Sequence, residues 1–253
     1  MRKLSSYMVA AIVLLALALC PMAARADNTA LYVGSCTAGV GTCTSLTGAA
    51  GLSASALFDL NTTTDTLTVT LTNTSLGDAK DATAILLAVL FNSSGLTPVS
   101  ASLNGSTVYG TFVNNVGEGW QYKSGISAHN ENSGISAAGF GVFGPDGNFY
   151  KTGQKLAGSN YGIAPAGYTN TGNASIKDPI IQNSIEFTLK AAPGFSLSEL
   201  GSSIVFQYGT SLDEPYFTGN LQGQVPEPPV TALLACSALL FGGLFRRFHW
   251  SLF

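Results

Sequence analysis

The feature that most constrains the fold is a strict alternation of apolar and hydroxylated residues in the middle of the chain. Residues 66–72 read Thr-Leu-Thr-Val-Thr-Leu-Thr, so apolar side chains occupy every second position. Successive side chains of a β-strand point to opposite faces, whereas a helix would scatter these residues around its axis. The segment therefore predicts a half-buried strand with its threonine face toward solvent.

Four further segments have the length and composition of strands. Residues 184–190 repeat the alternation, and residues 203–208 form a more buried run. Residues 84–91 are continuously apolar over a length that fits a central strand better than a helix. Residues 54–60 alternate less cleanly and lead through a turn into residues 66–72, which predicts a hairpin.

Turn-forming steps such as Asn-Gly, Asp-Gly and Gly-Ser separate these segments, and no sustained helical period appears between the two chain ends. Many short strands bounded by turns predict an all-β fold, an antiparallel β-sandwich of jelly-roll-like form. We expect one such extracellular domain at residues 27–224. An N-terminal signal helix (residues 1–26) and a C-terminal transmembrane helix (within residues 225–253) would flank it.

The N-terminal segment has the three parts of a secretory signal peptide. Arg2 and Lys3 give it a positive start, residues 8–19 are continuously apolar, and an Ala-Arg-Ala step ends at Ala26. This order predicts cleavage by signal peptidase between Ala26 and Asp27. The alternative, an uncut anchor helix, would need a longer apolar stretch.

The C-terminal segment combines a proline-rich break, an apolar stretch and a basic pair. Its parts in order are Pro226, Glu227 and Pro228, then apolar residues 230–245, then Arg246 and Arg247. Basic residues stay on the cytoplasmic side of a membrane, which would place the preceding domain outside. The apolar stretch is slightly short of the roughly 20 residues that span a bilayer, and an uncut anchor is the alternative to a processed tail.

This three-part order resembles the PEP-CTERM sorting signal of Gram-negative bacteria. In that family an exosortase, a membrane enzyme, processes the tail, and the protein goes to the cell surface or the exopolysaccharide matrix. The resemblance implies exosortase and signal peptidase as processing partners and membrane contact through the C-terminal helix before processing. It implies exopolysaccharide as a partner at the destination. We expect no cofactor.

The body of the chain is also similar to exosortase-dependent surface proteins. The matching stretches are residues 67–75, 134–144, 183–189 and 206–215. Such proteins are defined by the sorting tail and a shared β-rich body, generally without an assigned activity. The resemblance therefore implies a location more than a chemistry, and it transfers no catalytic residue.

The charge of the chain excludes one class of function. Charged residues make up 10% of the sequence, well below the roughly 25% of ordinary globular proteins. Residues 27–224 hold thirteen acidic side chains and six lysines, a net charge near −7. A nucleic-acid-binding protein needs a basic surface that displaces counterions from phosphates, so we expect no nucleic-acid partner.

The predicted mature region contains two cysteines, Cys36 and Cys43, with six intervening residues that include two glycines. An oxidising compartment favours a disulfide between them, which would staple a short loop. A metal clip is the alternative, but no histidine or further cysteine lies nearby, and we expect no metal site.

Residues 109–165 are rich in glycine, asparagine and aromatic side chains, and they suggest a long connection on the sandwich. Trp120 and Tyr122 are the candidate ligand-binding residues, because exposed aromatic rings stack on sugars. This hypothesis would make the chain a secreted carbohydrate-binding module or adhesin. The competing interpretation is that the aromatic side chains fill a small core beneath the loop.

The sequence shows no arrangement typical of an enzyme. His129 is the one histidine of residues 27–224, and no Gly-x-Ser-x-Gly turn accompanies it. Asp213 and Glu214 are adjacent, so in a strand they would point to opposite faces, unlike the paired carboxylates of glycosidases. Residues 144–148 offer oxygen ligands for calcium but lack the spacing of a dedicated loop, which favours an ordinary turn. We therefore expect a non-catalytic protein.

Overall fold

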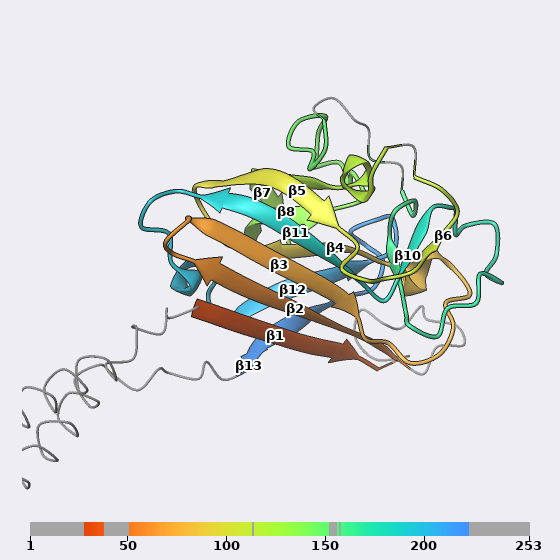
Figure 1. Ribbon diagram of the computed structural model, residues 1–253. Coiled ribbons are helices and arrows are strands. Elements are labelled where there is room, and N and C mark those ends of the chain that lie inside the picture. The colour runs from red at the N-terminus through yellow and green to blue at the C-terminus, as the bar shows by residue number, and fades with distance from the viewer. Residues whose placement is uncertain (1–27, 38–50, 113, 152–155, 157, 223–253) are drawn as a thin grey trace, which may run out of the picture. The chain divides into compact units, whose positions relative to one another are not determined.

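The described strands form one curled sheet, as the computed structural model shows (Figure 1). The structure describes residues 28–37, 51–112, 114–151, 156 and 158–222. The strands are β1 (Asn28–Cys36), β2 (Leu52–Asn61), β3 (Thr66–Asn73), β4 (Leu86–Phe91), β5 (Leu96–Ser102), β6 (Val108–Tyr109), β7 (Gln121–Ala128), β8 (Glu131–Ser136), β9 (Ile163–Ala164), β10 (Ile180–Gln182), β11 (Ser184–Ala191), β12 (Ser203–Tyr208) and β13 (Tyr216–Gln222). Short 3-10 turns are η2 (Ala82–Ala84), η3 (Val116–Gly119) and η4 (Leu197–Leu200).

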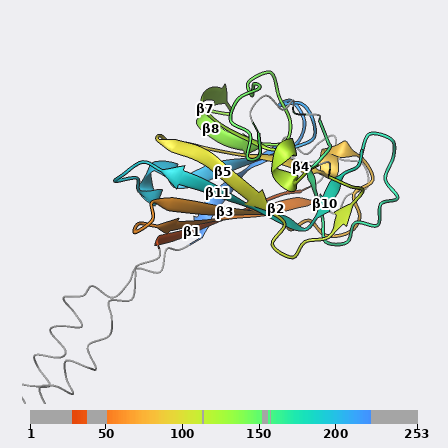
Figure 2. The same ribbon diagram turned by 45° about the horizontal axis from the view of Figure 1, so that its top comes forward.

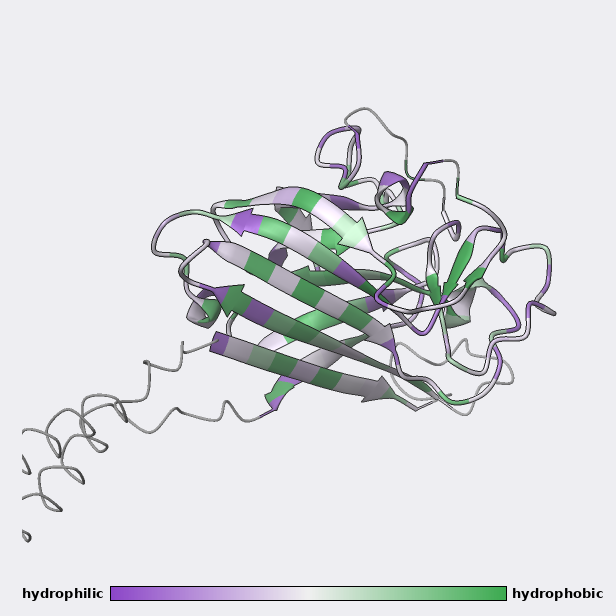
Figure 3. Cartoon of the chain, viewed as in Figure 1, coloured by the Kyte–Doolittle hydropathy of each residue, from purple (hydrophilic) through white to green (hydrophobic). Residues whose placement is uncertain are grey.

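The prediction of an all-β body is confirmed, since the described residues contain no α-helix. The five predicted strands correspond to β2, β3, β4, β11 and β12, and β2 pairs with β3 as the expected hairpin. In Figure 3 hydrophobic bands alternate with pale ones along β3. The apolar side chains of β2 and β3 point inward and are buried, as the period of two requires, except for Leu57 of β2, which is on the outer face and 38% exposed.

The prediction of a sandwich of antiparallel sheets is met only in part. The strand order is β5-β11-β3-β2-β1-β13-β12-β4-β9-β10-β6, with β8 also beside β4 and β7 beside β8. One pair, β9 with β10, is parallel, so the sheet is mixed. Because β1 hydrogen-bonds to both β2 and β13, the two layers stay joined as one sheet.

The curl brings the two halves of the sheet face to face over a shared core. Phe58 of β2 meets Phe91 of β4 edge to face, with ring centroids 5.3 Å apart. Trp120, which precedes β7, packs on Phe187 of β11 with centroids 5.0 Å apart. These contacts join elements from the two halves of the sheet, which places the core inside the curl.

The bend between β1 and β13 depends on two glycines. A Cβ atom on Gly34 would lie 2.5 Å from the carbonyl oxygen of Thr218, and one on Gly219 would lie 2.4 Å from Cε2 of Phe206. Both distances are far below van der Waals contact. The chain therefore needs residues without side chains where the sheet turns from one layer into the other.

The sheet has two distinct ends along the strand direction. Leu31 pairs with Gln222, so the start of β1 and the end of β13 lie side by side. We call this end the base; residues 62–65, 92–95 and 192–202 connect strands there. The opposite end, the top, carries β6, β10 and residues 74–85, 165–179 and 209–215 (Figure 1).

The predicted signal helix and C-terminal transmembrane helix lie outside the described residues. Among the residues that are described, no helix is long and apolar enough to cross a bilayer. Residues 28–225 form a compact unit of their own.

Candidate functional site

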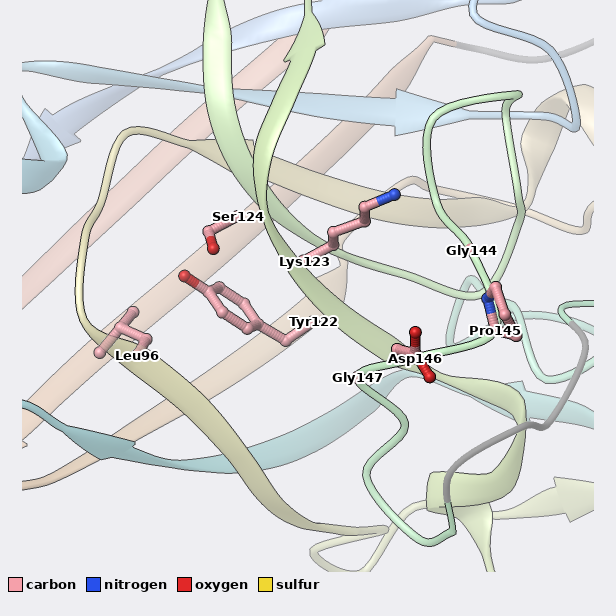
Figure 4. Close-up of a pocket in the computed structure, with 8 residues that line it drawn as sticks. All are labelled: Leu96, Tyr122, Lys123, Ser124, Gly144, Pro145, Asp146 and Gly147. Carbon is pink, nitrogen blue, oxygen red and sulfur yellow. The ribbon is translucent and has the colours of Figure 1, made fainter.

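The two ends of the curled sheet meet at a seam without strand pairing. Among the described strands, β5 pairs only with β11, and β7 pairs only with β8. Figure 2 shows β7 and β8 beyond β5, on the side away from β11 and β3. A cavity of about 280 Å³ opens at this seam. Figure 4 shows its lining residues, which are Leu96, Tyr122, Lys123, Ser124, Gly144, Pro145, Asp146 and Gly147.

One wall of the cavity is the turn at residues 144–147, which packs directly on the backbone of β7. The backbone N–H of Tyr122 donates to the carbonyl oxygen of Gly147 at 2.9 Å, and Gln121 bridges to Asn148. Gly147 has a φ of +93°, and a Cβ atom there would lie 2.1 Å from the Tyr122 carbonyl oxygen. Only glycine permits this approach, so Gly147 fixes the wall.

Polar groups of both charges border the cavity. The ammonium of Lys123 donates to the carbonyl oxygen of Val142 at 2.7 Å, which ties the chain after β8 to β7. In Figure 4, Lys123 extends toward the side of Gly144, away from the Tyr122 ring. Asp146 is exposed at the mouth. One ammonium, one carboxylate and the hydroxyls of Tyr122 and Ser124 around a small apolar surface suit a small polar ligand.

The position of Tyr122 fits its predicted ligand-binding role, but its burial does not. The residue lines the cavity, but its side chain is only 4% exposed. Its hydroxyl lies 3.2 Å from Oγ of Ser93, and its ring stacks on Phe91 at 6.4 Å. Tyr122 therefore belongs mainly to the core and leaves little ring surface for a sugar.

The surroundings of Trp120 give its predicted ligand-binding role no support, because the residue has no exposed surface. Its indole N–H donates to the carbonyl oxygen of Tyr161 at 3.0 Å, and its ring is covered by Phe187. The segment that we expected to be a long loop contains the β7–β8 hairpin, which pairs with β4. The competing interpretation, aromatic side chains that fill a core, is the one that the structure supports.

Sequence reasoning missed a buried carboxylate next to Trp120. Glu118 in η3 is 7% exposed. Its carboxylate accepts hydrogen bonds from the Tyr161 hydroxyl and, at 2.7 Å, from the side-chain amide of Asn114. Tyr161 has a φ of +65°, unusual for a bulky residue. The hydrogen-bonded carboxylate of Glu118 holds this strained turn against the core, so Glu118 has a structural role.

A second buried carboxylate, Glu131 at the start of β8, is less well satisfied. The residue is 8% exposed, and its Oε2 atom has no hydrogen-bond partner. Burial raises the pKa of Glu131, and a hydrogen bond from the Asn92 side chain opposes this shift without cancelling it. Nothing in the sequence around Glu131 signals burial, because charged residues in turns are usually exposed.

His129 has a structural position at the tip of the β7–β8 hairpin. Its Nε2 atom lies 2.8 Å from Oε1 of Gln207, and its ring stacks on Tyr216 with centroids 3.7 Å apart. The buried Gln207 amide also donates to the carbonyl oxygens of Tyr208 and Ser211. An amide and a phenol ring do not activate a nucleophile, so these contacts fix the hairpin on β12 and β13.

Three of the stretches that carry the family resemblance meet at the top of the sheet. The Asn73 N–H donates to the Asn183 carbonyl oxygen at 3.0 Å. The Tyr208 hydroxyl donates to the carbonyl oxygen of Ser53 at 2.8 Å and lies 3.1 Å from Oδ1 of Asn73. Burial raises the pKa of the Tyr208 phenol above its usual range. This network joins strands, so the residues in it have a structural role.

The remaining predicted residues fall largely outside the described part of the chain. Cys36 is disulfide-bonded, whereas its predicted partner Cys43 lies outside the described residues. So do all parts of the predicted sorting motif, which are Pro226, Glu227, Pro228, Arg246 and Arg247. Within the described residues, no group of three or more His, Cys, Asp or Glu side chains is placed to hold a metal ion.

We compared the chain with models of protein families, with curated proteins and with solved structures, and none of them matches.

Proposed function

We propose that the chain is an exported, non-catalytic protein of a Gram-negative cell surface or exopolysaccharide matrix, and that an exosortase sorts it. The observation that carries the proposal is the order of three parts in the C-terminal sequence: Pro226-Glu227-Pro228, then an apolar stretch, then Arg246-Arg247. A secretory signal at the other end supports it.

The described body is compatible with this proposal. Its strands begin at Asn28, next to the expected cleavage site, and end at Gln222, shortly before the proline-rich motif. Its buried polar groups serve packing and turns, as at Gln207 and Glu118. Two layers over one core are also what a jelly-roll-like sandwich requires, and we propose that description for the curled sheet.

Mass spectrometry of the protein from a host with an exosortase tests the sorting. We expect a mature N-terminus at Asp27 and a C-terminus near Pro226–Pro229. Replacement of Glu227 by Ala should leave the tail uncut, because it removes the charged residue of the motif. Pro229→Ala, just outside the motif, is the matched control. An intact Phe253 in the wild-type protein would refute the processing.

The seam cavity favours a second candidate function, glycan binding. Ser124 and Asp146 offer a hydroxyl and a carboxylate at its mouth, groups that bind sugar hydroxyls. A glycan array with the full chain tests this candidate. Binding that Asp146→Ala removes, and that Asp213→Ala at the exposed top leaves intact, would support it. No bound glycan would leave the non-catalytic surface protein as the better description.

A further inference from the structure

Lys123 borders the seam cavity and forms no salt bridge within the part of the chain that the structure describes. The two salt bridges found there involve other lysines, Lys80 and Lys190. Lys123 is half-buried, and its ammonium donates to the carbonyl oxygen of Val142 at 2.7 Å. An ammonium carries three N–H donors, so two remain for a further acceptor.

The space beside this ammonium is open on the side of Gly144. A Cβ atom on Gly144, which lines the cavity, would lie 3.6 Å from the Lys123 Nζ atom. Apart from the chain neighbours of Gly144, no other described atom lies within 4 Å of that position. Figure 4 shows the Lys123 side chain extended toward Gly144. A group of a ligand can therefore approach the ammonium from this side.

The two charges of the cavity differ in exposure. Asp146 is exposed at the mouth, whereas Lys123 is half-buried. Water and salt screen an exposed charge more strongly than a partly buried one. The cavity therefore selects chiefly for an anionic group that pairs with Lys123, and Asp146 is left to accept hydrogen bonds from hydroxyl groups.

A uronic acid, a sugar with a carboxylate on its terminal carbon, has both kinds of group on one ring. Its carboxylate can accept from Lys123, and its ring hydroxyls can donate to Asp146 and exchange hydrogen bonds with Ser124. The cavity of about 280 Å³ is small, which suits one sugar unit. A neutral sugar would leave Lys123 without a counter-ion. A densely charged polyanion would be repelled by the net charge near −7 of residues 27–224.

From these observations we infer that the seam cavity binds one uronic acid unit of an acidic polysaccharide, with the carboxylate of the sugar on Lys123. The inference rests on glycan binding at this cavity, the second candidate function, and it adds the class of sugar and the residue that selects it. The bond from Lys123 to Val142 then orients the ammonium for the ligand.

Calorimetry with the purified full-length chain tests the class of sugar. The probes are short oligomers of galacturonic, glucuronic and mannuronic acid, each paired with its carboxyl-reduced form, in which every carboxylate is a primary alcohol. At least one acidic oligomer should bind several-fold more tightly than its reduced form. A rise in salt from about 0.05 M to about 0.5 M should weaken only the acidic oligomer, because salt screens the ion pair.

Three lysine variants test the residue. Lys123→Gln should lower the affinity for the acidic oligomer several-fold and leave the reduced form almost unchanged. Lys123→Arg keeps the charge and should retain most of the binding. Lys177→Gln removes the same charge from an exposed position at the top and is the matched control. Thermal unfolding of each variant checks that the fold is intact.

A second pair of variants tests the same contact without altering Lys123. Gly144→Asp places a carboxylate beside the ammonium and should abolish binding of the acidic oligomer by taking its place. Gly144→Asn has the same shape without the charge, and it should bind several-fold more tightly than Gly144→Asp. The 3.6 Å separation is ordinary van der Waals contact, so both side chains fit.

The outcomes separate the inference from the function on which it rests. Equal binding of acidic and reduced oligomers would overturn the selection for a uronic acid and leave glycan binding supported. Selective binding that survives both Lys123→Gln and Gly144→Asp would overturn the role of Lys123. If no oligomer of either form bound, the inference and the glycan-binding function would both be wrong, while the proposal of an exported surface protein would stand.

Discussion

The two layers of the curled sheet share one core but differ in the burial of their outer faces. In β3, Leu67, Val69 and Leu71 are fully buried and the threonines between them remain partly exposed. In β4, all six residues are buried. The layer that contains β3 is therefore buried on one face, and the layer that contains β4 is buried on both.

The buried outer face of the layer that contains β4 has its own small hydrophobic cluster. Its buried members are Ala88, Leu90, Ile126, Ala128 and Val205, and the partly buried side chains over it are Phe140, Val142, Phe143, Leu212 and Tyr216. The covering residues come mainly from the chain after β8 and from the start of β13. An alternating pattern thus marks a strand with one free face, and a continuous apolar pattern marks a strand that is covered on both.

The largest expected effect separates the outer faces of the two layers. Leu90→Ala should lower the free energy of unfolding by about 2–5 kcal/mol, because it leaves a cavity under the cover. Thr70→Ala on the open face should change it by less than about 0.5 kcal/mol. Urea unfolding of both variants measures the difference. Similar losses would mean that the cover over Leu90 adds little.

A smaller effect tests how tightly the cover is packed. A Cβ atom on Gly134 would lie 2.6 Å from Cδ2 of Leu90, whereas one on Gly139 has no neighbour within 4 Å. Gly134→Ala should therefore cost about 1–3 kcal/mol of stability by overpacking. Gly139→Ala is the matched control and should be close to neutral. Thermal unfolding compares them, and a neutral Gly134→Ala would show that Leu90 can move aside.

Glu131 lies in the covered layer and predicts an unusual dependence of stability on pH. Burial raises the pKa of Glu131 in the folded state above 4.5, so the proton is bound more tightly in the native chain. The stability that Glu131 contributes is full below 4.5 and is lost as the pH rises through the folded pKa. Glu131→Gln should therefore unfold at higher denaturant concentration than wild type at neutral pH.

The same comparison at acid pH completes the test of Glu131. Below pH 4.5 the extra stability of Glu131→Gln over wild type should shrink, since wild-type Glu131 is then protonated and uncharged, as the glutamine is at every pH. An advantage that stays constant with pH would point to a packing effect of the amide.

The smallest effect concerns Asp78, a half-buried carboxylate at the top whose pKa is shifted in the opposite direction. Burial alone would raise its pKa, but hydrogen bonds from Lys80, Thr169 and Thr171 outweigh burial and lower the pKa to about 2. The stability from Asp78 is therefore full above 3.8 and is lost as the pH falls through about 2. NMR titration of the carboxyl group measures this pKa. Thr169→Val removes one donor and should move the pKa back toward 3.8.

Strands were predicted best where the apolar residues follow one clear pattern, either strict alternation or a continuous run. The alternation in β3 and the apolar run in β4 were sufficient, because each pattern reports directly on which faces are buried. β1 was missed, since Leu31 and Val33 on its outer face are apolar like its inner residues. β7 and β8 were missed because they place polar residues, among them Gln121 and Ser136, at fully buried positions.

The candidate site was harder to predict than the strands, because the residues that contact one another there lie far apart in the sequence. Trp120 is covered by Phe187, and its indole bonds to Tyr161, and neither neighbour is close in sequence. The cavity also combines Leu96 of β5 with the turn at Gly147, which only the curl of the sheet brings together. No local pattern could have shown that an aromatic residue in a glycine-rich segment is buried.

The pairing of β1 with β13 has a mechanical consequence. Because Asn28 and Gln222 leave the sheet at the same end, a force that pulls these two residues apart would peel the strands from one another one hydrogen bond at a time. A force between Gln222 and the top loops would instead act along β13 and load its bonds to β1 and β12 together. The described body should therefore yield easily when Asn28 and Gln222 are pulled apart, and it should resist strongly when Gln222 is pulled against the top.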